Sequence, residues 1–196
     1  MERHTPISGL ILAGGQGQRL DGQDKGLVLV AGVPMVAEVI RRFSGQVAHL
    51  AISANRNIEA YESYGFPVLP DKSMNFDGPL AGISAGLAWC PSPLLAIVPC
   101  DSPKLPTDLV ARLEKNLQRE KAEIAMAVVD GKRQPVFALI KKSLHSSLTD
   151  FLSSGERKIG KWYESRDLIK VPFDDTDAFI NINTESDRRD LELTYQ

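Results

Sequence analysis

Cysteine and histidine are scarce in this sequence of 196 residues. The two cysteines, Cys90 and Cys100, are separated by nine residues and have no companion pair, so they support neither a zinc site nor a disulfide framework. The three histidines, His4, His49 and His145, lack a common metal-ligand spacing. We therefore expect two buried, reduced thiols, and histidines that serve as surface or packing residues.

The sequence also lacks an excess of charge of either sign. Its 23 basic and 25 acidic residues give a formal charge of −2, so no basic field is available to hold a nucleic-acid backbone. The N-terminus has no apolar stretch or cleavage site of a secretory signal. The uncharged run from Gly78 to Cys100 has 23 residues, but four prolines interrupt it. We expect a cytoplasmic protein with neither nucleic acid nor membrane as a partner.

No repeat, low-complexity tract or linker divides the chain, and its length predicts a single domain over residues 1–196. Apolar runs with β-strand character alternate with segments of helical periodicity. The predicted strands are Ile7 to Leu12, Val47 to Ser53, Leu94 to Val98, Ile124 to Val129 and Val136 to Ile140. Predicted helices contain Met35 to Phe43, Leu80 to Leu87, Leu109 to Leu117, and a last helix opened by a capping box at Thr184 to Asp187. This alternation predicts an α/β fold whose mostly parallel sheet is covered on both faces and binds ligands at its carboxyl edge.

A glycine-rich loop follows the first predicted strand directly. Residues 13–25 read AGGQGQRLDGQDK, with four glycines and a terminal lysine. Such a backbone can approach phosphates closely, and Arg19 and Lys25 supply the positive charge that a triphosphate requires. The spacing matches neither a Rossmann fingerprint nor a Walker loop. A flexible turn with solvated charges is the alternative interpretation.

A second candidate site lies at the end of the strand Leu94 to Val98, where Asp101 follows Pro99 and Cys100. A carboxylate at the ligand-binding edge suits magnesium, which takes few carboxylates and completes its octahedron with waters and substrate phosphates. The alternative role for Asp101 is to cap the turn before Ser102 and Pro103.

The segment from Gly82 to Gly86 matches the Gly-x-Ser-x-Gly nucleophile elbow of serine hydrolases, with Ser84 as the nucleophile. An elbow requires a strand immediately before its serine, whereas Leu80, Ile83 and Leu87 lie on one face of a predicted helix. The hydrolase is therefore kept only as a remote alternative.

Several motifs together resemble the molybdenum cofactor guanylyltransferases, within the larger group of nucleotidyltransferases. They are LAGGxGxR at residues 12–19, DKG at 24–26, ANR at 54–56, GPLAG at 78–82, CDSP at 100–103, QP at 134–135, GER at 155–157 and FININT at 179–184. The resemblance covers nearly the whole chain. It implies a Rossmann-like three-layer α/β/α nucleotidyltransferase fold, and an enzyme that transfers GMP from magnesium GTP to molybdopterin and releases pyrophosphate.

The resemblance also implies roles for individual residues. Arg19, Lys25 and Asp101 are the expected catalytic residues, with Asp101 as the ligand of Mg²⁺. The expected nucleotide site consists of Leu12, Ala13, Gly14, Gly15, Lys25, Ser53, Asn55, Asp71 and Asp101. The expected pterin site consists of Gly78, Gly82, Arg157, Asn181 and Asn183. Members of this family often have asparagine in place of Ser53, so Asn55 is a candidate to take over that contact with the base.

Two further alternatives to guanylyl transfer remain open. One is cytidylyl transfer to molybdopterin or to a sugar alcohol phosphate, and another is a carrier that only holds the pterin for a partner. The asparagines at 181 and 183 also have a structural interpretation, in which they tie the turn before Thr184. The expected partners are GTP and the molybdopterin cofactor, with molybdenum-insertion proteins and molybdoenzymes as further candidates.

Overall fold

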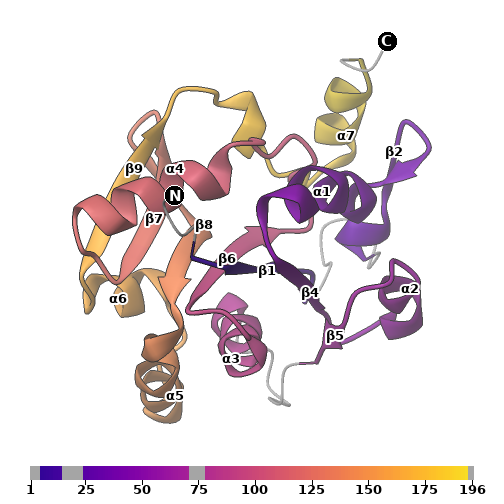
Figure 1. Cartoon of the computed structure of the whole chain (residues 1–196). Helices are drawn as coiled ribbons and strands as arrows, with labels where there is room; N and C mark the ends of the chain where they lie inside the picture. Colours follow the sequence, from indigo (N-terminus) through magenta and orange to yellow (C-terminus); the bar gives the residue numbers. More distant parts are fainter. Residues whose placement is uncertain (1–4, 15–23, 71–77, 194–196) are drawn as a thin grey trace.

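The computed structural model describes residues 5–14, 24–70 and 78–193, and within them a seven-stranded sheet forms the centre of the molecule (Figure 1). The strand order is β5-β4-β1-β6-β8-β7-β9. All its neighbouring pairs are parallel except the two that β8 makes with β6 and β7. The strands are β1 (Ile7–Leu12), β4 (His49–Ser53), β5 (Val68–Leu69), β6 (Leu94–Pro99), β7 (Ile124–Val129), β8 (Lys132–Lys141) and β9 (Leu168–Phe173).

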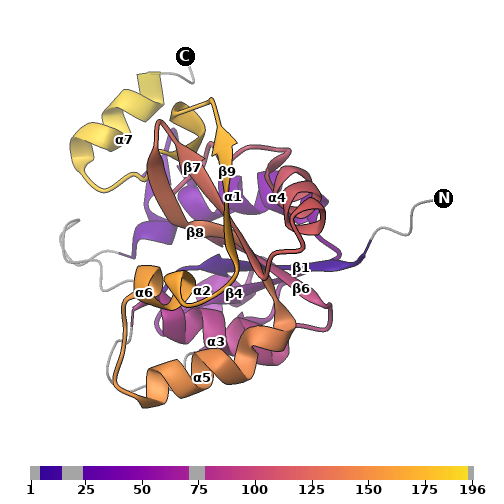
Figure 2. The same cartoon turned by 90° about the vertical axis from the view of Figure 1, so that its left-hand side faces the viewer.

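Helices cover both faces of this sheet (Figure 2). The α-helices are α1 (Met35–Phe43), α2 (Ile58–Glu62), α3 (Pro79–Trp89), α4 (Leu109–Arg119), α5 (His145–Ser153), α6 (Ile159–Glu164) and α7 (Glu185–Glu192). Among the described residues, four 3₁₀ helices lie at η1 (Lys25–Leu27), η2 (Ser44–Gln46), η3 (Lys142–Leu144) and η4 (Asp177–Phe179). In Figure 2, α1 and α4 lie on one side of the sheet, and α3 and α5 lie on the other.

Alternation along the central strands explains this three-layer arrangement. Successive side chains of a strand point to opposite faces, and here both faces are apolar. On β1, Ile11 packs with α1 and α4, whereas Leu10 packs with α3, α5 and α6. On β6, Val98 packs on the face covered by α1 and α4, and Ile97 packs on the face covered by α3, α5 and α6. A strand with apolar residues at consecutive positions is thus buried on both sides, as the sequence predicted.

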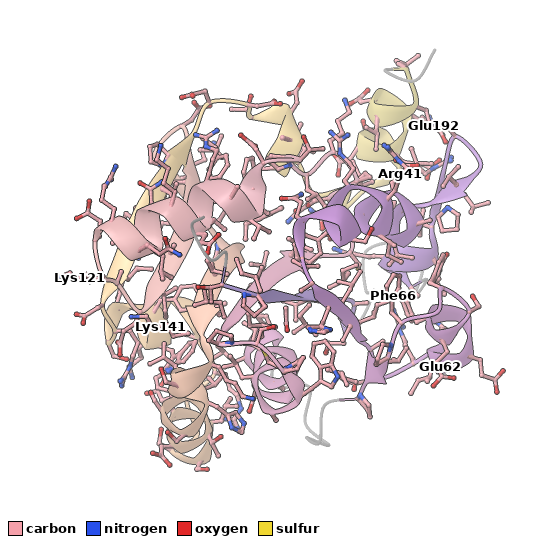
Figure 3. All side chains as sticks on the ribbon, in the orientation of Figure 1. Arg41, Glu62, Phe66, Lys121, Lys141 and Glu192 are labelled. Carbon is pink, nitrogen blue, oxygen red and sulfur yellow. The ribbon has the colours of Figure 1, made fainter. Side chains whose placement is uncertain are left out.

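The last part of the chain forms a small unit with the hairpin of β2 (Leu29–Val30) and β3 (Val33–Pro34). Val30 and Met35 pack there with Ile182 and Leu191 in a small core of their own. Glu192 on α7, labelled in Figure 3, accepts a hydrogen bond from the backbone N–H of the hairpin turn, at 3.2 Å. The predicted capping box is confirmed at the start of α7, because the Thr184 and Asp187 side chains each accept a bond from the other's backbone. Residues far apart in sequence are thereby joined next to the carboxyl edge of the sheet.

The five predicted strands are confirmed, with β4 two residues shorter and β8 longer than expected. The sequence missed β5, which has only two residues, and β9, which is an edge strand. Lys170 and Pro172 interrupt the apolar pattern of β9, as is typical of strands that must not pair further. In the described part of the chain, no helix is both long and apolar enough to cross a membrane.

The ladder between β7 and β8 contains an irregularity that the sequence did not reveal. Met126 is paired with Ala138, but the next residue of β7, Ala127, is paired with Gln134. Pro135 has no N–H to donate to the ladder, which is consistent with a bulge at this point. The carbonyl of Pro135 accepts a hydrogen bond from the buried Tyr163 hydroxyl at 2.9 Å, so α6 partly compensates for the broken ladder.

Candidate functional site

The candidate site lies at the carboxyl ends of β1, β4 and β6. These strands are parallel neighbours, with Leu12 paired to Ser53 on one side and to Pro99 on the other. Beyond the strands, Ala13 N donates to Ser53 O at 2.8 Å and Cys100 N donates to Leu12 O at 3.1 Å. The segments that follow the three strands therefore emerge side by side, where open α/β sheets bind their ligands.

Lys25 and Asp101 meet at this edge although 76 residues separate them. Asp24 caps η1, and from its first residue Lys25 extends Nζ to within 3.3 Å of Asp101 Oδ2. The Lys25 ammonium also donates to Asn183 Oδ1. Burial raises the pKa of Asp101 above its usual value, while the Lys25 charge lowers it in part. The site thus holds a mostly buried carboxylate beside a cation that retains some exposure.

Asn181 and Asn183 belong to a segment that is fastened to the Asp101 turn. Ile182 N donates to Asp101 O at 2.9 Å, and Ser102 Oγ lies 2.5 Å from Asn181 Oδ1 as its hydrogen-bond donor. The Asn183 N–H is bound by the Asp187 carboxylate at 2.9 Å. Both asparagines thus support the turns around Asp101 and α7, and their proposed contact with a pterin stays a prediction.

The loop after β1 is described as far as Gly14, which is exposed next to Asn55. A Cβ atom at Gly14 would lie 3.8 Å from Asn55 Nδ2, so the two residues face one another. Three residues expected at the site, Gly15, Arg19 and Asp71, lie outside the described residues. In contrast to Asn55, Ser53 is buried, with 3% of its surface exposed.

Gly78 and Gly82, both expected at the pterin site, differ in structure. Gly78 precedes α3 in a left-handed backbone conformation with φ 68°, whereas Gly82 lies inside the helix. A Cβ atom at Gly82 would lie 2.6 Å from Ser53 Oγ and 3.0 Å from Leu12 Cδ2. Gly82 therefore allows α3 to approach the ends of β1 and β4 closely, which the motif alone did not show.

Ser84 also lies inside α3, so the residues immediately before and after it are helical. A nucleophile elbow requires a sharp turn between a strand and a helix. The structure therefore removes the serine hydrolase alternative.

Arg157 lies in the connection between α5 and α6, where Nη1 donates to the carbonyls of Leu152 at 2.7 Å and Glu156 at 2.8 Å. The structure does not place it in the cluster of Lys25, Asp101 and Asn183. Sequence reasoning also missed two residues beneath that cluster, Asp24 and Tyr61, although Asp24 is the immediate neighbour of Lys25. Asp24 could have been found in the DKG motif, whereas nothing in the sequence around Tyr61 indicates a role at the site.

The donor set at Asp101 fits a magnesium ion that obtains most of its ligands from a substrate. Within the described segments, no three His, Cys, Asp or Glu side chains are grouped so that they could hold a metal ion by themselves. Asp101 offers one hard oxygen donor group at the carboxyl edge, and magnesium is often held by one or two carboxylates together with phosphates and water. Asp101 is thus a candidate ligand for this ion.

Comparison with known proteins identifies the family of this chain. Residues 9–169 match the family described as the MobA-like NTP transferase domain. The molybdenum cofactor guanylyltransferase of Cupriavidus metallidurans is 51% identical over 183 residues, which cover 91% of this chain and 90% of that protein. The protein of the same name from Ralstonia nicotianae is 49% identical over 196 residues, covering 95% and 96% of the two chains.

Solved structures show the same fold at lower identity. Molybdopterin-guanine dinucleotide biosynthesis protein A from Archaeoglobus fulgidus aligns with a TM-score of 0.81 and 22% identity, over 96% of this chain and 98% of that one. The CMP:2-keto-3-deoxy-manno-octonic acid synthetase, in a complex with CTP, aligns with a TM-score of 0.79 and 11% identity, over 97% and 98% of the chains. The family match and the similarity to these relatives therefore show that this chain belongs to the MobA-like nucleotidyltransferases, the family of the molybdenum cofactor guanylyltransferases, and is an enzyme that transfers a nucleotidyl group.

Proposed function

We propose that the enzyme transfers GMP from magnesium GTP to molybdopterin and forms molybdopterin guanine dinucleotide and pyrophosphate. Relatives with about half of their residues identical over more than 90% of the chain carry the name of this activity. The structural observation that carries the proposal is the meeting of Lys25 and Asp101 beside the Leu12–Gly14 segment. A cation, a carboxylate and an open backbone at one sheet edge suit a nucleoside triphosphate.

The reaction forms one P–O bond and breaks another. A phosphate oxygen of molybdopterin attacks the α-phosphorus of GTP, and the bond between that phosphorus and the β-phosphate oxygen breaks, so pyrophosphate leaves with the electron pair. A phosphate monoester has a second pKa of about 6 and is largely ionised at pH 7. The attack therefore needs no general base, and catalysis depends on alignment and charge neutralisation.

The nucleotide side of the site follows the edge of the sheet. We assign contacts with the nucleotide to the backbone of residues 12–15, and phosphate binding to Lys25 and Arg19. Asn55, which is exposed beside Gly14, is better placed than the buried Ser53 to contact the base, and Asp71 is assigned to the base or ribose. The pterin side is assigned to Gly78, Gly82, Arg157, Asn181 and Asn183.

Asp101 would hold the magnesium ion. Proteins of this family generally depend on a divalent metal ion. When bound, magnesium would neutralise the charge on the phosphates and on the departing pyrophosphate. Lys25 Nζ lies 3.3 Å from Asp101 Oδ2. Loading of magnesium GTP would bring phosphates to Lys25 and free the Asp101 carboxylate for the metal.

The test of this proposal has two parts. Thermal shift with magnesium and GTP, CTP, ATP or UTP identifies the nucleotide, because a ligand at 100 times its dissociation constant adds about 2.7 kcal/mol of stability. Pyrophosphate release is then measured after mixing that nucleotide with molybdopterin. We expect GTP to stabilise the protein and pyrophosphate to appear only with both substrates. Stabilisation by CTP instead would indicate a cytidylyltransferase, and binding without pyrophosphate release would indicate a carrier.

A further inference from the structure

Asp24, the residue before Lys25, is buried and surrounded by donors. Only 8% of its surface is exposed. Its carboxylate accepts hydrogen bonds from the Tyr61 hydroxyl at 2.5 Å and from Asn57 Nδ2 at 3.0 Å, and it lies 3.6 Å from Arg56 Nε. These two donors and the Arg56 guanidinium, which forms an ion pair, come from the end of the β4–α2 connection or from α2 itself. Asp24 therefore joins the Lys25 segment to α2.

Tyr61 contacts both neighbours of Lys25. Besides its bond to Asp24, its hydroxyl oxygen would lie 2.5 Å from a Cβ atom at Gly26, so only glycine allows this approach. Tyr61 is fully buried, whereas the next residue of α2, Glu62, is exposed (Figure 3). Burial raises the pKa of the Tyr61 hydroxyl, so its proton stays available for the Asp24 carboxylate.

We propose that Tyr61 is a positioning residue for Lys25. By binding Asp24 and supporting Gly26, it fixes the backbone on both sides of Lys25, whose side chain extends to Asp101. The inference rests on the proposed function, in which Lys25 binds the phosphates of GTP. A tyrosine that only filled the core would stabilise the fold without acting through Lys25.

A double-mutant cycle separates these two roles. Tyr61→Phe keeps the ring and removes the hydroxyl. Its effect is measured both in the otherwise unchanged protein and in a protein that also carries Lys25→Ala. The dissociation constant of magnesium GTP is measured by calorimetry, and the KM values of GTP and molybdopterin are measured by pyrophosphate release. We expect Tyr61→Phe to weaken GTP binding about tenfold, or about 1.4 kcal/mol, in the native background. In Lys25→Ala the same change should have little effect, and the KM of molybdopterin should stay unchanged.

Tyr64→Phe is the matched control. Tyr64 lies just beyond α2 and packs against the same core, but the described residues offer its hydroxyl no hydrogen bond. Tyr64→Phe should therefore bind magnesium GTP with the same dissociation constant as the unchanged protein.

An equal loss in both backgrounds would show that Tyr61 only supports the fold, and no loss in either would equally overturn the inference. If Tyr61→Phe does not fold, Asn57→Gly replaces it: glycine tolerates the left-handed backbone of Asn57, φ 50°, and removes another donor to Asp24. The same dependence on Lys25 is expected, and additive losses would again overturn the inference. If the unchanged protein and Tyr64→Phe bind no GTP, the proposed function itself fails.

Discussion

Replacement of Asp101 by asparagine tests the metal assignment while keeping the shape of the side chain. Asparagine retains one carbonyl oxygen but loses the negative charge that a hard divalent cation favours. Alteration of groups that only orient metal ligands typically costs 10- to 100-fold in metal affinity, so loss of a ligand charge should cost at least as much. We expect half-maximal pyrophosphate release at a magnesium concentration at least about tenfold higher than for the unchanged protein.

The free energy of unfolding should change little in Asp101→Asn, because the attraction of Lys25 and the cost of burying the carboxylate oppose one another. With an effective dielectric constant of about 20, charges 3.3 Å apart attract by about 5 kcal/mol. Removing the carboxylate from water costs several kcal/mol, and its pKa is raised, so burial outweighs the attraction of Lys25. Asparagine avoids this cost and can still accept a bond from Lys25. The free energy of unfolding should therefore stay within about 1 kcal/mol, or increase.

The difference in stability between Asp101→Asn and the unchanged protein should also depend on pH in a definite direction. The folded protein holds the Asp101 proton more tightly than the unfolded chain, so ionised Asp101 reduces stability above its raised pKa. This reduction disappears as the pH falls toward 3.8, the ordinary value. Any gain in melting temperature from asparagine should thus be greatest near pH 7 and diminish in acid.

The assay is a magnesium titration of pyrophosphate release at saturating GTP and molybdopterin, with melting curves at several pH values as the control for folding. If Asp101 only caps its turn, asparagine should serve equally well, because both side chains form such turns. Superimposable magnesium titrations would then refute the metal assignment.

Further predictions concern the neighbouring residues. Lys25→Ala should lower pyrophosphate release at least about tenfold, since it removes a charge-assisted contact, without changing the melting temperature by more than a few degrees; near-normal turnover would remove Lys25 from the site. Gly82→Ala should cost about 1–3 kcal/mol of stability in urea unfolding, because its Cβ would press against the ends of β1 and β4, and an unchanged midpoint would contradict that close approach. Ser84→Ala, on the same helix, should leave both stability and turnover nearly unchanged; complete loss of activity in a folded protein would revive the hydrolase. Thr184→Ala removes the cap of α7 and should cost about 1 kcal/mol, as measured by chemical denaturation. Asp187 in that capping box has a lowered pKa, mainly because it accepts a backbone bond, so its stabilisation should be lost as the pH falls through that lowered value.

Much of the fold is determined by local pattern in the sequence. Apolar residues at consecutive positions of β1, β6 and β7 require burial on both faces, which already predicts a sheet between two helical layers. The helical spacing of Leu80, Ile83 and Leu87 likewise excluded a strand before Ser84. The weakly patterned elements escaped prediction because β5 has two residues and β9 carries polar residues, and because α2 and α6 are too short to show a helical period, although they bury Tyr61, Trp162 and Tyr163.

The sequence by itself also determined which residue types stand after each strand, and hence that Lys25 and Asp101 were candidates for phosphate and metal. It could not determine their partners, because the contacts join positions 76 and 158 residues apart and depend on strand order. Only the tertiary structure showed that Asn183 reaches Lys25, that Gly82 closes on Ser53 and that Tyr61 lies beneath Gly26. Each of these depends on the distance between two backbones, a quantity set by the packing of α2, α3 and the C-terminal segment on the sheet rather than by local sequence.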